Sequence, residues 1–389
     1  MILLFILTNK EKLTKNLMFK YFQKYKNLEK KQKVIIYSVF SAIIILLLSV
    51  SAFASYHYFA KQKTTSSTQN PEDLIDFDQE INLDINNVQE EDKKTLNVLL
   101  AGYGGAGHQG GYLSDVIQVV HFNFEKKQIN FISIPRDLYL VNKDQKGYKV
   151  NALMSAGMSN GGGVKTGLEL MQKSIGQIIG LPIKYFVGID FVSFKRVIGY
   201  ELNSIEVNVS QTLEDAWYPI EGAQLDPCGY SPEEIANLTA TYSGFELESK
   251  FACRYEHLLY KQGKVKMEGH DALAYVRSRH SSSDYDRSRR QVEVLTAIRD
   301  KLFTLEALKK IPKFYEAFSK HVTTNLDLES AKYLAPLLAN TNEFEVKTIN
   351  LTPENVLQSS KSNEGAFIVV PKAGMNNWSQ VQTFIREQI

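Results

Sequence analysis

A chain of 389 residues with 44% hydrophobic and 23% charged residues can bury a large core, which excludes a wholly disordered protein. Its formal charge of +2 is unevenly divided: the first 33 residues carry nine lysines and two glutamates, a net charge of +7, which leaves −5 for the rest of the chain. A nucleic-acid-binding protein normally carries basic surface on its folded part, so this distribution excludes nucleic acid as the expected partner.

The uncharged stretch VIIYSVFSAIIILLLSVSAF at residues 34–53 is long enough to cross a bilayer core of about 30 Å. Lysines crowd its N-terminal side, which the positive-inside rule assigns to the cytoplasm. We therefore expect a basic cytoplasmic segment at residues 1–33, one uncleaved transmembrane helix at residues 34–55, and an extracytoplasmic remainder. The alternative is a cleaved signal peptide, because Ala52-Phe53-Ala54 resembles a cleavage site, although the apolar part of a signal peptide is normally shorter.

Residues 61–95 contain TTSSTQNPED and an acidic run, a composition typical of a polar stalk. Residues 96–389 then read as one folded domain, in which short apolar strands alternate with helices of 3.6-residue period. This order predicts an α/β fold with a mixed central sheet flanked by helices. The expected strands are NVLLAGY, VIQVVHFNF, INFISI, KYFVGIDF, SIEVNV and residues 345–350 and 366–370, and the expected helices are residues 166–179, 328–339 and 377–387.

Residues 210–263 are aromatic, polar and without clear periodicity, and we interpret them as a long insertion loop over one end of the sheet. They hold both cysteines, Cys228 and Cys253, and an even count in an exported segment favours a disulfide, with free thiols as the alternative. Such a bond would contribute about 3 kcal/mol by the chain-entropy relation.

The most informative segment is ALAYVRSRHSSSDYDRSRRQ, which begins at Ala272. We interpret ALAYV as a buried strand, so that Arg277 and Arg279 point to the same side. Ser283 and Asp286 have the spacing of a capping box for the helix that follows. On that helix the side chains of Arg287, Arg290 and Gln291 share one face.

Arginines at a helix N-terminus oppose the helix dipole and cost stability unless an anion binds there. Free backbone N–H groups and converging guanidinium groups together suit a phosphate. The alternative is a solvated charged face, neutralised by Asp284 and Asp286. Because four or five cationic groups converge from two elements, we favour an anion site with phosphate as its ligand.

Two further segments belong to this candidate site. The strand INFISI ends before Arg136 and Asp137, and ligands of open α/β sheets bind at such strand ends. The segment GYGGAGHQGGYLSDV contains six glycines but matches no dinucleotide or P-loop fingerprint. Its Asp115 is a candidate magnesium ligand, since Mg²⁺ accepts one or two carboxylates together with phosphate oxygens; a local capping role is the alternative.

In this order, NVLLAGYGG, LSDVIQVVHFN, ISIPRDLYL, KVNALMSAG and GHDALAYVRSRHSSSDYDRSRRQ resemble the LytR–CpsA–Psr family of bacterial envelope proteins. The resemblance implies a membrane-anchored phosphotransferase that moves a glycopolymer from a polyprenyl-pyrophosphate carrier to peptidoglycan or another envelope acceptor, with Mg²⁺ at the pyrophosphate. The positions that match the family's pyrophosphate-binding and catalytic residues are Arg136, Arg277, Arg279, Arg287 and Gln291, Asp115 matches its magnesium-associated aspartate, and Arg290 and Lys149 match recurrent positions.

Three departures from the family pattern concern the metal more than the phosphates. The aspartate common in the first glycine loop is absent from Gly102-Tyr103-Gly104-Gly105, the arginine before Ser114-Asp115 is Leu113, and Leu202-Asn203-Ser204 replaces Leu-Gly-Gly. Asp284 or Asp286 is a candidate replacement for the missing carboxylate.

The mechanism expected from these residues is electrostatic. Arg136 and Arg287, with Arg277 and Arg279, stabilise the phosphates, and Asp137 is the candidate acceptor of the hydroxyl proton. Two alternatives stay open: a polyprenyl-pyrophosphate hydrolase with the same pocket, and a non-catalytic protein that binds anionic glycopolymer, which the missing glycine-loop aspartate favours.

Overall fold

The computed structural model describes residues 94–389 except residues 109, 143–145, 160, 279–283, 303–310 and 340, and it omits the side chains at 284, 285, 311 and 342. The predicted cytoplasmic segment and transmembrane helix lie outside the described residues, as does all but the end of the stalk. Within the described residues, no helix combines the length and the apolar character needed to cross a bilayer.

A six-stranded mixed sheet forms the centre of the fold, in the order β11-β6-β1-β2-β3-β12. Strands β1, β2 and β3 form an antiparallel meander, β6 runs parallel to β1, and β12 runs parallel to β3. The predicted mixed sheet is therefore confirmed. Its strands are β11 (Thr323–Thr324), β6 (Tyr185–Asp190), β1 (Thr95–Tyr103), β2 (Ser114–Asn123), β3 (Gln128–Ser133) and β12 (Glu345–Asn350).

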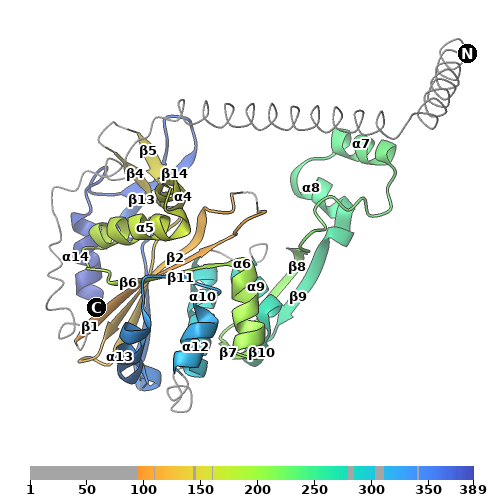
Figure 1. Cartoon of the computed structure of the whole chain (residues 1–389). Helices are drawn as coiled ribbons and strands as arrows, with labels where there is room; N and C mark the ends of the chain where they lie inside the picture. Colours follow the sequence, from red (N-terminus) through yellow and green to blue (C-terminus); the bar gives the residue numbers. More distant parts are fainter. Residues whose placement is uncertain are drawn as a thin grey trace, which may run out of the picture. The chain divides into compact units, whose positions relative to one another are not determined.

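Helices α5 (Gly163–Ile179) and α14 (Ser379–Gln388) cover one face of this sheet (Figure 1). The predicted helix at 166–179 is confirmed, with Leu168, Met171 and Ile175 fully buried on its inner side. It ends at Gly180, whose φ of 71° places it in the left-handed region that favours glycine. This face packs into the largest apolar cluster among the residues that the structure describes.

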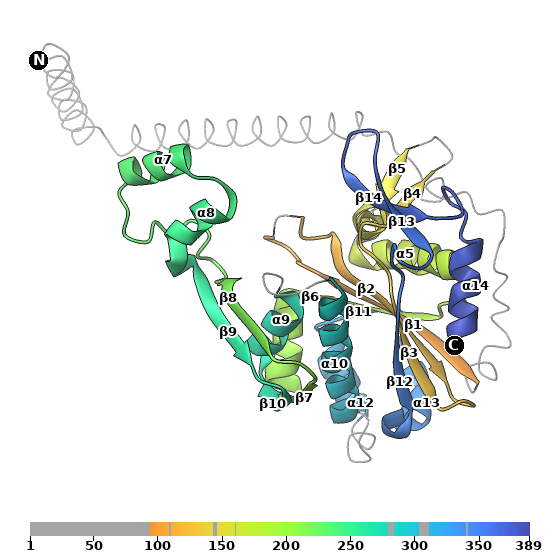
Figure 2. The same cartoon turned by 180° about the vertical axis from the view of Figure 1, so that it is seen from behind.

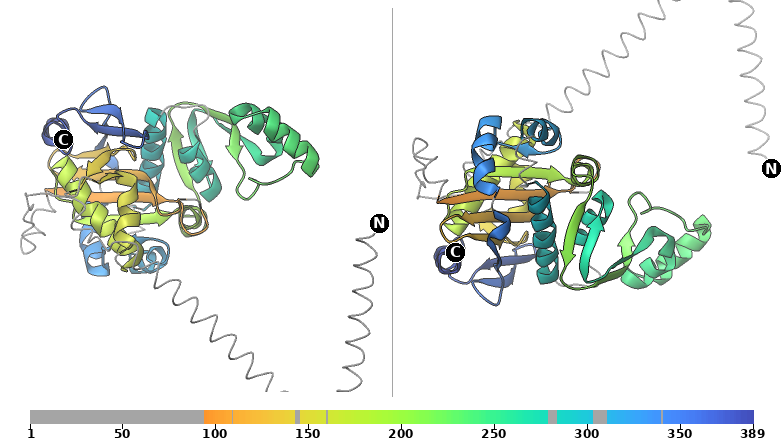
Figure 3. Two further views of the ribbon diagram at one scale, coloured as in Figure 1. Left: turned by 90° about the horizontal axis from the view of Figure 1, so that it is seen from above. Right: turned by 90° about the horizontal axis from the view of Figure 1, so that it is seen from below.

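Helices α10 (Asp284–Leu302), α12 (Ile311–Phe318) and α13 (Leu328–Leu338) lie on the opposite face of the sheet (Figures 2 and 3). Their contact with the strands is looser, since Val98, Leu100 and Leu295 are only partly buried there. The predicted helix at 328–339 is α13, and it begins where Asp327 accepts a hydrogen bond from the Ser330 backbone N–H.

A second core lies beyond α10, where Ile198, Val207 and Tyr275 are buried. The predicted strand SIEVNV belongs to it as β7, paired with β10 outside the central sheet. Its elements are α6 (Phe191–Arg196), the π-helical turn η4 (Val197–Glu201), β7 (Ile205–Val209), β10 (Gly263–Met267) and α9 (Gly269–Arg277).

Helix α9 overturns the prediction that ALAYV is a strand. All five residues are buried, and a short continuous apolar run does not distinguish a buried strand from a buried helix. The helix is favoured by a reciprocal cap, in which Glu268 and Asp271 each accept a hydrogen bond from the other's backbone N–H. Arg277 is its last residue, whereas Arg279 and Ser283 lie outside the described residues, so the predicted capping box does as well.

The insertion is a regular structure and not a loop, which corrects the prediction for residues 210–263. A β-hairpin projects from the second core and carries two short helices at its far end (Figures 1 and 2). The predicted disulfide is confirmed between Cys228 and Cys253. The elements are β8 (Leu213–Pro219), α7 (Pro232–Thr241), α8 (Gly244–Glu248), η5 (Ser249–Arg254) and β9 (Tyr255–Tyr260).

Small elements complete the fold on the side of α5. The strand expected at 366–370 is β14, and its partner β13 escaped prediction because four of its five residues, Gln358 to Lys361, are polar and exposed. These elements are β4 (Tyr139–Val141), β5 (Gly147–Lys149), η3 (Val150–Ala152), α4 (Leu153–Met158), β13 (Leu357–Lys361) and β14 (Phe367–Pro371). The short helix η6 (Thr341–Glu343) follows α13 and precedes β12.

Candidate active site

Several chain segments that are distant in sequence meet at one edge of the central sheet. Because β1 and β6 are parallel and β2 is antiparallel to both β1 and β3, this edge collects the C-terminal ends of β1, β3 and β6 and the start of β2. Asp115 lies at the start of β2, Asp190 is the last residue of β6, and Arg136 follows the end of β3, all at that edge. Ligands of α/β sheets bind at such edges, as the sequence predicted for Arg136.

A bulge in β2 turns Asp115 toward the side of the sheet that faces α10. Tyr103 pairs with Ser114 and Gly102 pairs with Val116, so Asp115 is the extra residue between two pairs. Arg136 donates from Nη1 to Asp115 Oδ1 at 2.9 Å. The two side chains retain 30% and 45% exposure, so the pair is open to a ligand and contributes little stability by itself.

Asp137 holds Arg136 from the other side. Its Oδ1 accepts a hydrogen bond from Lys149 Nζ at 2.6 Å, and its Oδ2 lies 3.6 Å from Arg136 Nε. Asp137 does not line the cavity described below, in contrast to the role of proton acceptor expected for it. Its carboxylate is occupied by two cations, so this geometry makes Asp137 and Lys149 the support of Arg136.

The glycine-rich loop between β1 and β2 folds tightly upon itself. Gly105 donates its backbone N–H to Gly111 O at 2.8 Å, and a Cβ at Gly111 would lie 2.0 Å from Gly105 O. Gly105 has a φ of 87°, and a Cβ there would lie 2.9 Å from the Cβ of Asp190. These glycines are therefore required by the loop's own packing against the end of β6.

Arg277, at the end of α9, is held by two aromatic side chains. Its guanidinium lies 4.2 Å from the centroid of the Phe191 ring, and the same ring forms an edge-to-face contact with His108, with 5.6 Å between the ring centroids. Tyr218 of β8 is the second: burial raises the pKa of its phenol, and the charge and hydrogen bond of Arg277 oppose that shift. The insertion strand thus helps to orient a pocket arginine.

Arg290 has a different position from the one predicted. It is 1% exposed, and its Nη2 donates to Ser278 O at 2.7 Å. Ser278 in turn donates from Oγ to the buried carboxylate of Asp215 at 2.6 Å. Burial lowers the pKa of the Arg290 guanidinium. The residue ties the end of α9 to α10 and does not line the cavity, because α10 turns its side away from the sheet.

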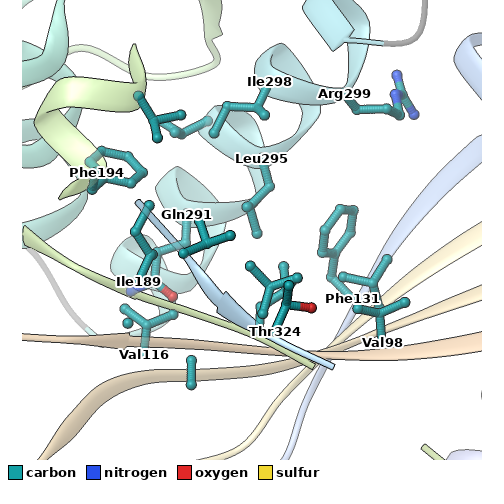
Figure 4. A pocket seen from close by; sticks show the side chains of 18 of the residues that line it. Val98, Val116, Phe131, Ile189, Phe194, Gln291, Leu295, Ile298, Arg299 and Thr324 are labelled. Atoms are coloured by element: carbon teal, nitrogen blue, oxygen red, sulfur yellow. The ribbon is translucent and has the colours of Figure 1, made fainter. Parts of the chain in front are cut away.

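A cavity of about 630 Å³ lies between the open face of the sheet and helices α6, α9, α10, α12 and α13. Its walls are almost entirely apolar, and Figure 4 shows Leu295 and Ile298 of α10 opposite Val98 and Phe131 of the sheet. Along α10 the lining residues recur on one helical face from Arg287 to Leu302, which spans about 22 Å at 1.5 Å per residue. The cavity is therefore long and narrow.

Most of the charged residues of the cavity gather at the end formed by the sheet edge. Asp115, Arg136, Arg277, Arg287 and Gln291 all line it. Gln291 Oε1 accepts a hydrogen bond at 3.3 Å from Gln118 Nε2 of β2. Arg299, a further lining arginine of α10, lies apart from Gln291 in Figure 4. A mouth with three arginines thus opens into a channel whose walls are mainly apolar.

The residues at the mouth provide few groups for a metal ion. Among the described residues that line the cavity, Asp115 is the single carboxylate. Asp190 already accepts hydrogen bonds from the N–H and the hydroxyl of Ser193, and Asp286 lies 3.5 Å from Arg289. The side chain of Asp284 is outside the described set. Within that set, one group of three close ligand-type residues occurs, Asp226, Cys228 and Cys253, and its cysteines form the disulfide. A magnesium ion fits here only with phosphate oxygens as further ligands.

The structure brings together five of the residues predicted from sequence: Asp115, Arg136, Arg277, Arg287 and Gln291. Sequence reasoning missed the supporting residues Phe191, Tyr218 and Gln118, because aromatic and amide side chains inside strands and helices carry no local signal of a site. Leu295, Ile298 and Leu302 recur at helical spacing in the sequence and form one apolar helix face. That pattern could have suggested a channel, but it is the same for a packed core.

The sequence matches the LytR_cpsA_psr family over residues 50–382. The chain belongs to this family. A curated relative, the polyisoprenyl-teichoic acid–peptidoglycan teichoic acid transferase TagT of Bacillus subtilis (strain 168), is 28% identical over 265 residues, 67% of this chain and 68% of TagT. The regulatory protein MsrR of Staphylococcus aureus (strain COL) is 23% identical over 295 residues, 75% of each chain.

Solved structures show the same fold. The crystal structure of Bacillus subtilis TagV superposes with a TM-score of 0.53 and 23% identity, and the match covers 76% of this chain and 97% of that chain. The shared α/β architecture agrees with the membership of this chain in the LytR_cpsA_psr family.

Proposed function

We propose that this LytR_cpsA_psr protein is a phosphotransferase that moves a glycopolymer from a polyprenyl-pyrophosphate carrier to peptidoglycan or another envelope acceptor. The observation that carries the proposal is the joining of a long apolar channel to a mouth at which three arginines, Arg136, Arg277 and Arg287, meet. A polyprenyl pyrophosphate has the matching polarity, with an apolar chain attached to a compact multiple anion. The names of TagT and TagV, both teichoic acid transferases, support the same reaction.

In this assignment, the polyprenyl chain lies along Val98, Phe131, Leu295 and Ile298, and the pyrophosphate lies at the mouth. Arg136, Arg277 and Arg287 bind its oxygens, Gln291 donates a further hydrogen bond, and Arg279 is a fourth candidate cation. The acceptor hydroxyl attacks the glycan-bearing phosphorus, the bond from this phosphorus to the bridging oxygen breaks, and polyprenyl monophosphate leaves. The hydroxyl proton leaves with the phosphate or solvent.

Arginine side chains supply what this step needs. Phosphoryl transfer depends mainly on positioning and on stabilising charge on the equatorial and leaving oxygens, so the protein needs no covalent nucleophile. Arg136 and Arg277 are held before any ligand binds, by Asp115 and Asp137 in one case and by Phe191 and Tyr218 in the other. Preorganised cations lose less free energy to reorganisation when charge develops.

Magnesium is part of the proposal, with Asp115 as its protein ligand beside two phosphate oxygens. When bound, it would neutralise phosphate charge. Asp137, which also lies against Arg136, would keep that arginine in place for the phosphates.

The location proposed for this site is outside the cytoplasmic membrane, on a chain anchored by residues 34–55. The charge asymmetry of the N-terminal 33 residues supports this orientation, and the disulfide between Cys228 and Cys253 fits an oxidising compartment.

A second candidate function is the binding of glycopolymer without turnover. The absence of a carboxylate from the first glycine loop and the relative named as a regulatory protein favour it. A hydrolase with water as acceptor would use the same pocket.

One experiment separates the three functions. The purified full-length chain is incubated with a polyprenyl-pyrophosphate-linked oligosaccharide, with and without Mg²⁺ and a peptidoglycan acceptor. A transferase releases polyprenyl monophosphate and attaches the glycan to the acceptor. Lipid release without attachment would mean a hydrolase, and binding without lipid release would mean a binding protein; either result contradicts the proposal.

A further inference from the structure

The outer part of the insertion keeps an unusual amount of apolar surface in water. Residues 219–250, all of which the structure describes, contain no buried residue. Ile220, Leu225 and Phe245 are 37%, 91% and 54% exposed. A concentration of exposed apolar side chains on an ordered segment is typical of a binding surface.

Aromatic contacts and covalent and polar restraints give this segment its order in place of a core. Trp217 forms edge-to-face contacts with Phe245 at 5.2 Å and with Tyr255 at 5.4 Å. The disulfide joins Cys228 to Cys253, and Arg254 Nε donates to Asp226 O at 2.7 Å. We call residues 219–250 together with Trp217 and Tyr255 the aromatic platform.

The aromatic platform is also acidic. Residues 219–250 carry six acidic side chains and one lysine, a net charge of −5. This charge repels phosphodiester polymers and the anionic surface of a membrane. Carboxylates accept hydrogen bonds from hydroxyl groups, and aromatic rings pack against the apolar C–H faces of sugars, so an uncharged sugar chain fits both features.

The root of the platform touches the cationic mouth. Tyr218 precedes it and contacts Arg277, which lines the channel. Glu221 forms an ion pair with Lys195 of α6, and the hydrogen bond from Lys195 lowers the pKa of Glu221, with further lowering by the charges of His108 and Arg277. A glycan attached to a pyrophosphate at the mouth therefore meets the platform first at Glu221.

We propose that the aromatic platform binds the first sugars of the lipid-linked donor and that these sugars are uncharged, unlike the phosphate-rich chain of a teichoic acid. This inference rests on the proposed function, because that function places the donor pyrophosphate at the mouth. It makes Trp217, Phe245 and the platform carboxylates determinants of donor specificity.

A binding experiment tests the inference without any turnover. The chain has two tryptophans, and Trp378 is 5% exposed within the core, so a change in tryptophan emission on ligand addition reports on Trp217. The full-length protein is titrated with uncharged tetrasaccharides of N-acetylglucosamine, glucose and galactose, and with a glycerol phosphate tetramer. We expect at least one uncharged sugar to shift the emission and the glycerol phosphate tetramer to leave it unchanged at physiological salt.

Variants assign the response to the platform. Phe245→Ala should weaken binding of the sugar about fivefold, the size expected for one aromatic contact. Phe367→Ala is the matched control, since Phe367 is 55% exposed on β14, away from the platform, and should not change binding. Glu246→Gln combined with Glu248→Gln should allow the glycerol phosphate tetramer to bind.

Several outcomes would overturn the inference: no emission change with any of the three sugars, equal binding of the glycerol phosphate tetramer, or a response only to a peptidoglycan disaccharide-peptide or to phosphatidylglycerol vesicles. Because the titration contains no lipid donor, sugar binding with failed transfer would refute the proposed function alone. Transfer of a lipid-linked glycan without platform binding would refute this inference alone.

Discussion

The two faces of the central sheet are built from the same strands but are packed in opposite ways. On β2, Ile117 and Val119 point into a solid cluster with α5 and are at most 3% exposed. Their neighbours Val116 and Val120 border the channel on the other face. Apolar side chains that line a channel contact fewer protein atoms than those in a packed core, so the open face contributes less to stability. This difference is consistent with a ligand that fills the channel.

The largest effect is expected at the mouth of the open face. Arg287→Ala should reduce glycan transfer by about 10³-fold, because one cation that stabilises the transferring phosphate is lost. The free energy of unfolding, measured by urea denaturation, should stay within about 0.5 kcal/mol of wild type. Arg386→Ala, an exposed arginine of α14 behind the solid face, is the control and should keep full activity. Unchanged transfer by Arg287→Ala would remove Arg287 from the site.

Truncation of a leucine should distinguish the two faces by stability. Leu168→Ala on the solid face should lower the free energy of unfolding by about 2–5 kcal/mol, because a void is created in a packed core. Leu295→Ala already borders open space and should cost only about 1–2 kcal/mol of lost burial. Urea denaturation with matching slopes measures both, and equal losses would contradict the difference in packing.

His121 interrupts the solid face and should make stability depend on pH. It is 3% exposed and its Nδ1 lies 2.7 Å from Asn97 Oδ1. Burial, with a smaller effect of Lys126, lowers the pKa of His121 to about 4, below the ordinary 6.5. Between these values the unfolded chain binds a proton that the native state does not.

The free energy of unfolding should therefore be fully retained above about pH 6.5 and fall by roughly 3 kcal/mol as the pH falls to about 4. Carboxylates add their own acid dependence, so the measurement compares wild type with His121→Gln by urea denaturation at several pH values. The variant should lose less stability over this interval. Parallel curves for the two proteins would show that His121 is not the group responsible.

A larger side chain that fills part of the channel should reduce glycan transfer more than it changes the free energy of unfolding. Val98→Phe places a ring in the open space seen in Figure 4 and should reduce transfer about tenfold, with no loss of unfolding free energy. The same change on the solid face, Val119→Phe, should cost about 1–3 kcal/mol by overpacking. A donor with a shorter prenyl chain should restore part of the activity of Val98→Phe. Normal transfer of the full-length donor by that variant would show that the channel does not hold the lipid.

The sequence by itself determined most of the elements and the cationic character of the site. Periodic apolar residues located α5, α13 and α14, and apolar runs between polar turns located β1, β2, β3, β6 and β12, because both signals are local. Family motifs selected Asp115, Arg136, Arg277, Arg287 and Gln291, which meet at one edge of the sheet.

Only the tertiary structure decided how these elements are used. Residues 272–276 are a buried apolar run that fits a strand or a helix, and they form a helix behind the reciprocal cap of Glu268 and Asp271. Arg290 is buried because α10 turns its side chain toward Ser278. The bulge that turns Asp115 depends on the pairing of β1 with β2. The channel has no sequence signature at all, since it is a space between strands and helices that are far apart in the chain, and a helix face that lines a space has the same pattern as one that fills it.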